Sequence, residues 1–457
     1  MTTPTEPSHR VPFREALAVW TRIGLLGFGG PAGQVALLHR ELVETRRWVD
    51  EARFLHALNY CMLLPGPEAQ QLATYLGWLL HRTPGAVVAG TLFVLPGALA
   101  VLALSALYAG YGALPAVAAL FFGLKPAVLA VVLEALLRVA RRALTRPALR
   151  AIAALAFLAL FAFAVPFPVV VFGAGALGLA LQRLAPLALP APASAHAGAV
   201  GDTVVERMAA AGELAHTRPS LARAARVLGV CGLLWAGPLL GLRALFGPRS
   251  VVLDEGLFFS RAAVVTFGGA YAVLAYVAQR AVDGYHWLLP GEMVDGLGLA
   301  ETTPGPLILV LEFVGFLGAY RHPGGLPPMA AGTLGAAVTV WTTFVPCFLW
   351  ILLGAPYLEA LRGNRALQAS LSAITAAVVG VILNLSLWFG LHVLFRGTSV
   401  LHLGPLHLLV PTLSSADPVA WALALLAVFG LLRLKLPMPA VLVGCAALGA
   451  LGRLAAG

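Results

Sequence analysis

The sequence contains few charged residues and shows no alternating pattern of apolar and polar residues. Asp, Glu, Lys and Arg make up 11% of its 457 residues, and hydrophobic residues make up 60%. A soluble globular chain carries about 25% charged residues, so the composition excludes a soluble fold. The apolar runs are long and continuous, which excludes an outer-membrane β-barrel. We therefore expect an all-α polytopic membrane protein.

Cysteine is also scarce, and several catalytic motifs are missing. The four cysteines lie in apolar segments, and no pair has the spacing of metal ligands. We expect buried free thiols, no metal and no other cofactor. The chain lacks a phosphate-binding loop of the type G-x-x-x-x-G-K-[ST], which argues against direct ATP drive. It also lacks an H-E-x-x-H motif and a serine nucleophile elbow, so we expect no enzyme activity.

The charge that is present is mainly positive. Thirty Lys and Arg residues exceed twenty Asp and Glu residues, giving a formal net charge of +10. In a soluble protein this charge would suggest nucleic-acid binding. Here the arginines lie in short loops between apolar segments. This position indicates that they set the orientation of the protein by the positive-inside rule and contact anionic lipid. We expect no nucleic-acid partner.

A Pro-Gly-Pro motif interrupts an apolar segment twice, at Pro65-Gly66-Pro67 and at Pro304-Gly305-Pro306. These motifs are 239 positions apart (304 − 65), and the same offset relates Arg22 to Arg261, Trp48 to Trp287, and Phe28-Gly29-Gly30 to Phe267-Gly268-Gly269. Pro-Gly-Pro cannot continue a helix. In lipid, a broken helix is tolerated only where protein or a water-filled cavity satisfies its backbone. The sequence therefore predicts two copies of one broken-helix module.

The repeat extends over nearly the whole chain. The offset grows to 250 between Pro96 and Pro346, and to 271 between Pro166 and Pro437, so insertions separate the later blocks. We expect a first repeat at residues 1–185, a cytoplasmic linker at 186–226, an unpaired span at 227–250 and a second repeat at 251–457. About thirteen hydrophobic segments result, by the length that a span requires.

The unpaired span follows an even number of crossings, so we expect the second repeat to be inverted relative to the first. We also expect each Pro-Gly-Pro segment to form a re-entrant hairpin. In that case the arginine-rich patch at residues 40–53 stays on the cytoplasmic side with Arg82, as the positive-inside rule favours. Fully spanning broken segments are the alternative.

The motifs Phe28-Gly29-Gly30-Pro31, His39-Arg40-Glu41, Arg47-Trp48 and Leu64-Pro65-Gly66-Pro67 resemble those of the chromate ion transporter family. Their echo in the second half extends the resemblance to the family's two-domain form. The resemblance implies a multi-pass transporter of the bacterial cytoplasmic (inner) membrane that exports chromate using the proton-motive force. A sulfate or other oxyanion carrier is the alternative of the same class, and a non-transporting membrane subunit or sensor is the alternative of another class. The oligomeric state stays open, with a homodimer as one option.

A tetrahedral dianion such as chromate needs positive potential and several N–H donors. Helix N-termini and glycine-rich turns supply both from the backbone, and intramembrane arginine and lysine add charge. The alternatives are that the glycines serve close helix packing and that the arginines extend to the interface. The predicted substrate-binding residues are Arg22, Gly29, Gly30, Asn59, Pro65, Gly66, Pro67, Lys125, Arg261, Gly268, Gly269, Thr303, Pro304, Gly305 and Pro306.

Four carboxylates are candidates for coupling transport to protons. An ionised carboxylate on the path would repel the anion, so its protonation can alternate with anion passage. Glu68 follows the first break and Glu134 lies within an apolar span, whereas Glu301 and Glu312 flank the second break. A helix-capping role is the alternative for Glu68, and a position at the basic interface is the alternative for Glu134.

Overall fold

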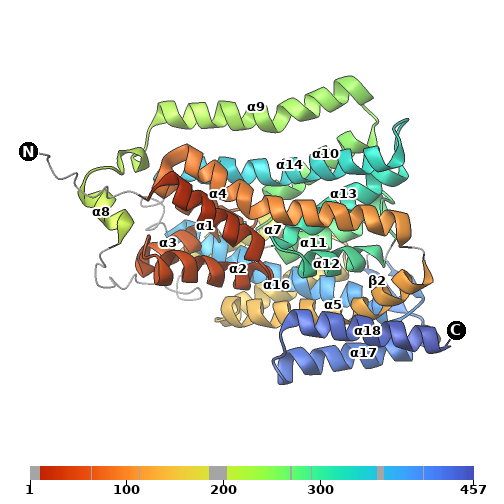
Figure 1. The fold of residues 1–457 in the computed structure, drawn as a ribbon. Coiled ribbons are helices and arrows are strands. Elements are labelled where there is room, and N and C mark those ends of the chain that lie inside the picture. Colours follow the sequence, from red (N-terminus) through yellow and green to blue (C-terminus); the bar gives the residue numbers. More distant parts are fainter. Residues whose placement is uncertain are drawn as a thin grey trace, which may run out of the picture.

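The computed structural model of the protein describes residues 11–62, 64–112, 114–184, 203–267, 270–289, 291–357, 365–404 and 406–456. Nearly all of them are helical (Figure 1), which confirms the expected all-α class. Six helices among the described residues are long and apolar enough to cross a membrane, and three shorter apolar helices accompany them. The protein is therefore a multi-pass membrane protein.

The helices of the two halves follow in the same order along the chain. The first half contains α1 (Phe13–Leu26), α2 (Gly30–His39), η1 (Arg40–Thr45), α3 (Glu51–Cys61), α4 (Glu68–Tyr111), α5 (Pro115–Ala143), α6 (Pro147–Phe161) and α7 (Phe167–Leu184). The second half contains α10 (Val251–Val265), α11 (Ala270–Gln279), η4 (Arg280–Gly284), α12 (Glu292–Thr302), η5 (Leu307–Leu309), α13 (Val310–Arg321), α14 (Pro328–Gly354), η6 (Ala355–Tyr357), α16 (Arg365–Leu394), α17 (Pro418–Val428), η8 (Phe429–Arg433) and α18 (Met438–Ala456). Helix α4 corresponds to η5, α13, α14 and η6, and α6 corresponds to α17 and η8.

Helix starts follow local sequence signals. The Asp50 side chain accepts a hydrogen bond from the Arg53 N–H at 2.8 Å and caps α3, and Asp417 caps α17 in the same way. Proline occupies the first turn of α5, α6 and α14, where its missing N–H costs nothing.

Helix α4 is two helices joined by a sharp reversal. Arg82 has φ +56° and ψ −150°, which is not a helical conformation. A methyl group added at Gly77 would come within 2.4 Å of the Gly85 carbonyl oxygen, so the chain folds back on itself at this point. The second half makes the same reversal between α13 and α14, which residues 322–327 join. These two helices form the most extensive contact between described elements.

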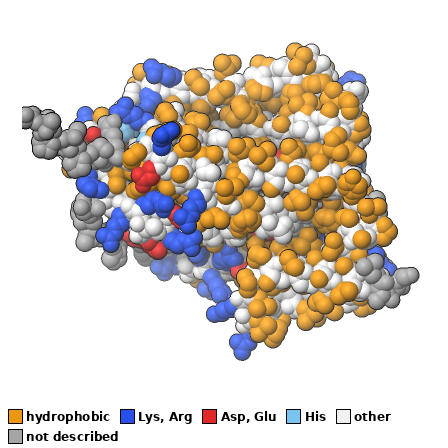
Figure 2. Space-filling view, in the orientation of Figure 1, with side chains coloured by type: hydrophobic (Ala, Val, Ile, Leu, Met, Phe, Trp, Pro, Cys, Tyr) orange, Lys and Arg blue, Asp and Glu red, His pale blue; other side chains and the backbone are white. Residues whose placement is uncertain are grey.

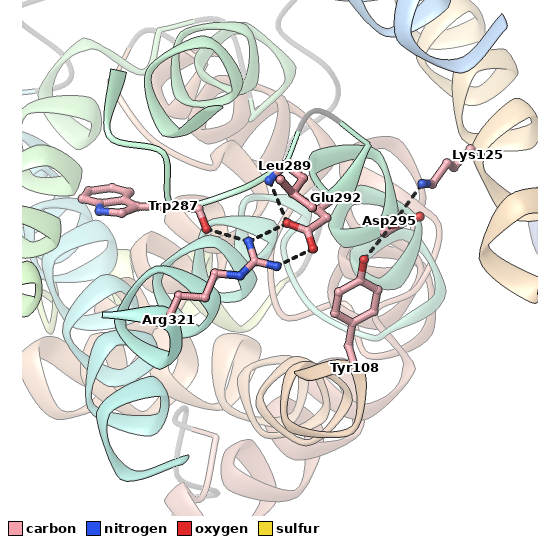
Figure 3. A network of polar contacts seen from close by, with 7 residues as sticks. All are labelled: Tyr108, Lys125, Trp287, Leu289, Glu292, Asp295 and Arg321. Atoms are coloured by element: carbon pink, nitrogen blue, oxygen red, sulfur yellow. Dashed lines mark hydrogen bonds and ion pairs between the residues drawn. The ribbon is translucent and has the colours of Figure 1, made fainter. Parts of the chain in front are cut away.

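Both ends of each broken segment lie at the same end of the molecule. In the second half, Arg321 at the end of α13 forms an ion pair with Glu292 at the start of α12 at 2.5 Å (Figure 3). In the first half, the Trp48 and Trp78 carbonyls both bond to the described part of the expected linker, through the Val205 N–H at 3.0 Å and the His216 ring at 3.2 Å. Each broken segment is therefore a hairpin, as expected.

The two hairpins enter from opposite ends. In Figure 1 the reversal within α4 lies at the left, near α8 (Val204–Ala210), and the connection between α13 and α14 lies at the right. The halves are thus inverted relative to each other. Their largest shared core packs Val131 of α5, Phe258 of α10, Leu297 of α12, Phe313 of α13 and Val378 of α16.

Two elements lie outside the repeat. Helix α9 (Leu221–Phe246) runs along one edge of the molecule over α14 and α10 and buries little of its surface (Figure 1). Strands β1 (Thr398–Leu403) and β2 (Leu406–Pro411) form an antiparallel hairpin, with Thr398 opposite Pro411. This hairpin is a small exception to the all-α expectation, and it lies in an insertion that the change of offset indicated. The expected linker at 186–226 begins outside the described residues, and α8, η3 (Ala215–Thr217) and the start of α9 follow.

Candidate functional site

The breaks of the two halves meet in the interior through a reciprocal pair of backbone hydrogen bonds. The Gly66 N–H donates to the Thr266 carbonyl at 2.8 Å, and the Gly305 N–H donates to the Gly27 carbonyl at 3.0 Å. Gly66 and Gly305 are equivalent in the repeat, and so are Gly27 and Thr266. Each Pro-Gly-Pro tip is therefore bonded to the segment just before the Phe-Gly-Gly motif of the other half.

Glycine is required at these tips for conformation and for space. Gly66 has φ +126° and Gly305 has φ +95°, a region that other residues rarely adopt. A methyl group added at Gly97 of α4 would come within 2.1 Å of the Pro304 carbonyl oxygen. Cys347, the equivalent of Gly97, packs against Gly66 in the same manner. The halves therefore approach each other backbone to backbone.

Two buried amides satisfy carbonyl groups that the broken helices leave free. The Gln34 side chain donates to the Gly305 carbonyl at 2.5 Å and to the Gly27 carbonyl at 3.2 Å, and is 1% exposed. The Gln71 side chain donates to the Pro65 carbonyl at 2.8 Å. Such partners are required where backbone is broken at membrane depth. The sequence analysis missed Gln34; the available signal was a lone amide in an apolar segment beside a break.

A buried carboxylate lies behind the first glycine pair. Glu301 is 3% exposed, and its Oε1 accepts a hydrogen bond of 2.5 Å from the Tyr271 hydroxyl. Its Oε2 has no hydrogen-bond partner among the described residues. A methyl group added at Gly30 would lie 4.0 Å from that oxygen. Glu301 and the glycine pair thus come together although they belong to different halves; the role of Tyr271 was not foreseen.

An open cavity of about 710 Å³ reaches Gly29 from the surface, and we call it the basic vestibule. Its charged lining residues are Glu134, Arg138, Arg141, Arg142 and Lys435, four cations and one carboxylate, for a formal net charge of +3. Arg138 forms an ion pair with Glu134. No ion pair of Arg141, Arg142 or Lys435 occurs within the described part of the chain.

The basic vestibule ends at the N-terminus of α2, where Gly29 and Gly30 both have positive φ. This arrangement places accessible backbone N–H groups and the positive end of a helix dipole beside four cations, which suits a small anion. From the sequence, the arginines at the end of α5 were expected only to set the orientation, and Lys435 was not singled out.

Figure 2 shows that Lys and Arg side chains gather toward one end of the molecule.

Other predicted binding residues lie away from this cluster. The Arg22 side chain is 59% exposed, and its Nε lies 3.7 Å from the Glu41 carboxylate. Arg261 and Asn59 are exposed as well. Thr303 is buried and donates to the Ala300 carbonyl. Gly268 and Gly269 lie outside the described residues, so the structure gives no view of their predicted role.

Lys125 belongs to a separate polar network. Its Nζ lies 3.3 Å from the Asp295 Oδ2, which also accepts a hydrogen bond of 2.8 Å from Tyr108 (Figure 3). Its charge is therefore compensated within the protein. The sequence analysis did not single out Asp295. Among the remaining acidic candidates, Glu68 is half-buried at the start of α4, and Glu312 is buried in α13.

The cysteines are free and buried, as expected. No group of three His, Cys, Asp or Glu side chains within the described ranges is arranged to hold a metal ion.

Two inverted copies of a broken-helix module that meet at a polar interior site are the architecture of inverted-repeat membrane transporters. The chain belongs to the chromate transporter family, whose sequence profile matches residues 14–179 and 253–450. This finding confirms the resemblance seen in the sequence, and it confirms that the protein belongs among membrane transporters and not among enzymes.

Three relatives illustrate the similarity. The chain is 34% identical to a chromate transport protein of Pseudomonas aeruginosa over 81% of this chain and 79% of the relative. It is 30% identical to a chromate transport protein of Cupriavidus metallidurans, over 83% and 82%. It is 29% identical to a probable chromate transport protein of Synechococcus elongatus, over 79% and 80%. No solved structure matches the chain.

Proposed function

We propose that the protein is a secondary active transporter that exports chromate across the bacterial cytoplasmic membrane, driven by the proton-motive force. The observation that carries this proposal is the meeting of the two Pro-Gly-Pro tips beside a basic vestibule that ends at Gly29. The names of the relatives from Pseudomonas aeruginosa and Cupriavidus metallidurans support chromate as the substrate.

The binding step follows from the chemistry of the dianion. Chromate enters the basic vestibule, whose net positive charge raises its local concentration. It then reaches the N–H groups at Gly29 and Gly30, where the α2 dipole favours negative charge. Backbone donors hold the ion without a fixed countercharge, so it can leave again.

The charge distribution supports export. The end of α5, the start of α6 and the turn between them carry Arg138, Arg141, Arg142, Arg146 and Arg150, and the positive-inside rule places such a basic connection in the cytoplasm. The basic vestibule would then open to the cytoplasm. An inside-negative potential is worth about 2.3 kcal/mol per charge per 100 mV, and it drives a dianion outward.

Glu301 is the favoured proton carrier of the four acidic candidates. Its free Oε2 faces Gly30, where an anion would sit, so an ionised Glu301 would repel the anion. Protonation of Glu301 removes that repulsion, and release of the proton after the anion has left restores it. The proton and the anion therefore bind together, which lowers the charge that crosses from −2 to −1, and the inside-negative potential still drives this charge outward.

Everted membrane vesicles test the proposal. With a proton gradient, vesicles that contain the protein should accumulate labelled chromate, and a protonophore should abolish the accumulation. Glu301→Gln should remove the pH dependence of chromate accumulation, whereas Glu15→Gln, at an exposed position in the first turn of α1, should behave as wild type. Accumulation of sulfate in preference to chromate would identify a different oxyanion carrier. Accumulation of neither would favour a non-transporting subunit.

A further inference from the structure

A second cavity has two walls that are equivalent to walls of the basic vestibule in the repeat. This cavity, which we call the neutral vestibule because no Lys or Arg is among its described lining residues, has a volume of about 150 Å³ and is lined by α16, α11 with η4, and the end of α6. Two of the corresponding elements line the basic vestibule, namely α5 in place of α16 and the connection between α17 and α18 in place of the end of α6, and Gly29 is its one lining residue next to α2. The two cavities therefore share two equivalent walls, one in each of the inverted halves.

The equivalent positions of the two cavities carry different charges. Asn384 takes the place of Glu134 and Trp388 takes the place of Arg138, both at an offset of 250. Ala164 takes the place of Lys435 at an offset of 271, and both residues have a left-handed backbone, with φ of +50° and +55°. The backbone is thus repeated while the side-chain charge is not.

Asp283 is the one charged residue among the described lining residues of the neutral vestibule, for a formal net charge of −1 against +3 in the basic vestibule. The two cavities thus differ by four formal charges. A cleft lined by charges of one sign concentrates counter-ions by about tenfold or more at low ionic strength. The electrostatic energy of a dianion in such a cleft is twice that of a monovalent anion. The charge difference between the two cavities therefore affects a dianion more strongly.

We propose that the basic vestibule is the loading site for a tetrahedral dianion and that the neutral vestibule is its release site, so that the protein binds its substrate with different affinity from the two sides of the membrane. This inference rests on the proposed function. A duplicated module with equal ends would bind and release the anion equally well at both. The unequal charges make capture tight at one end and release easy at the other.

The first test removes positive charge from the basic vestibule and leaves the two Pro-Gly-Pro tips unchanged. Arg142→Gln/Lys435→Gln should raise the dissociation constant of the purified full-length protein for chromate by about tenfold at low ionic strength. The increase should shrink at high ionic strength, where the charges are screened. Arg146→Gln/Arg183→Gln removes two exposed arginines at the same end that do not line the cavity, and should leave the constant unchanged. An unchanged constant in the first variant, or an equal increase in both, overturns the proposal.

A charge transplant tests the difference between the two sides. Ala164→Lys/Trp388→Arg gives the neutral vestibule cations at the positions that are cationic in the basic vestibule. In vesicles of the two orientations, it should lower the KM for chromate on that side and leave the KM on the other side unchanged. A KM that changes equally on both sides, or on neither, contradicts the inference.

Binding and transport separate this inference from the proposed function. Sulfate is measured beside chromate in every binding experiment. If the wild-type protein transports no chromate but binds sulfate in a manner that depends on the vestibule charges, the proposed substrate is wrong and the loading site stands. If chromate is transported and the vestibule charges have no effect on binding, the loading site is wrong and the proposed substrate stands.

Discussion

Single residues determine how closely the two modules approach each other. Gly97 of α4 lies directly against the Pro304 carbonyl, and the equivalent Cys347 lies against Gly66. Glycine at one side of each contact leaves room for this approach, so backbone groups of one half can bond to those of the other. Small residues have this role at many membrane helix interfaces.

A single added methyl group should disturb this contact. Gly97→Ala places a Cβ 2.1 Å from a backbone oxygen that cannot move independently, and we expect a loss of about 1–3 kcal/mol from overpacking. Thermal unfolding in detergent and chromate accumulation in vesicles should both decrease. Gly110→Ala, on the same helix at a position where the added methyl meets no described atom within 4 Å, is the control. Equal behaviour of the two variants would contradict the close contact.

The ion pair between Arg321 and Glu292 provides a second test at this scale. Glu292 is 9% exposed and receives hydrogen bonds of 2.5 and 2.7 Å from Arg321. Arg321→Gln leaves this carboxylate without its charged partner, at a cost of about 1–3 kcal/mol. The melting temperature should fall. Arg82→Gln, at the equivalent and exposed position of the first half, should have a smaller effect. A larger loss in Arg82→Gln would show that the pair contributes little.

At the scale of elements, the hairpins are held at their open ends, and the two halves do this differently. The second half uses the Arg321–Glu292 pair within the hairpin. The first half uses α8 and η3, which bond to the Trp48 and Trp78 carbonyls from outside the hairpin. Residues 203–217 therefore act as a clasp on the first hairpin.

This clasp should loosen in acid. Burial lowers the pKa of His216 below its usual 6.5, so the docked segment favours the neutral imidazole. The undocked segment binds a proton as the pH falls below 6.5, and the docked segment does so only at lower pH. Docking is therefore most stable above this range and weakens as the pH falls through the lowered pKa. Hydrogen exchange of residues 203–217, corrected for the intrinsic rate, should increase in acid.

His216→Gln is the matched variant for this effect, because it keeps a hydrogen-bond donor and removes the titration. Its exchange should not respond to pH in this range. A response equal to that of the wild type would assign the pH dependence to another group.

At the scale of the whole molecule, the inverted repeat turns two similar hairpins into one site. Gly66 and Gly305 each find their partner carbonyl only in the other half. Glu301 and Gly30 likewise come from different halves. Neither module contains the complete site, so both must be present in opposite orientations.

Cysteine labelling tests this arrangement, since the native cysteines are buried. Glu44→Cys and Thr83→Cys, at exposed positions near the two ends of the first hairpin, should react with an impermeant reagent from the same side of the membrane. His322→Cys, at the corresponding turn of the second hairpin, should react from the opposite side. Labelling of Glu44→Cys and Thr83→Cys from opposite sides would exclude the hairpin. Labelling of Thr83→Cys and His322→Cys from one side would exclude the inversion.

Many features could be predicted because they depend on patterns along the chain. The scarcity of charge indicated a membrane protein, and the repeated Pro-Gly-Pro motif indicated two broken modules. The positive-inside rule favoured hairpins, and the unpaired span indicated inversion. The family followed from motifs of a few adjacent residues. Each of these inferences needs only the order of residues and the requirements of a lipid environment.

The composition of the site could not be predicted in the same way. Lys435 and Glu134 are about three hundred positions apart and line one cavity, and nothing along the chain relates them. Gln34 was overlooked because its partners are carbonyls of another segment. Lys125 and Arg22 have carboxylates beside them, which a pattern of apolar runs does not reveal.

The order of residues alone thus determined the class, the duplication and the breaks, because lipid forces every polar interruption of a helix to have a structural reason. Only the tertiary structure decided which of the charged residues stand free beside the tips and which are already paired. The reason is that ion pairs and cavities form between segments whose distance along the chain carries no information about their distance in space.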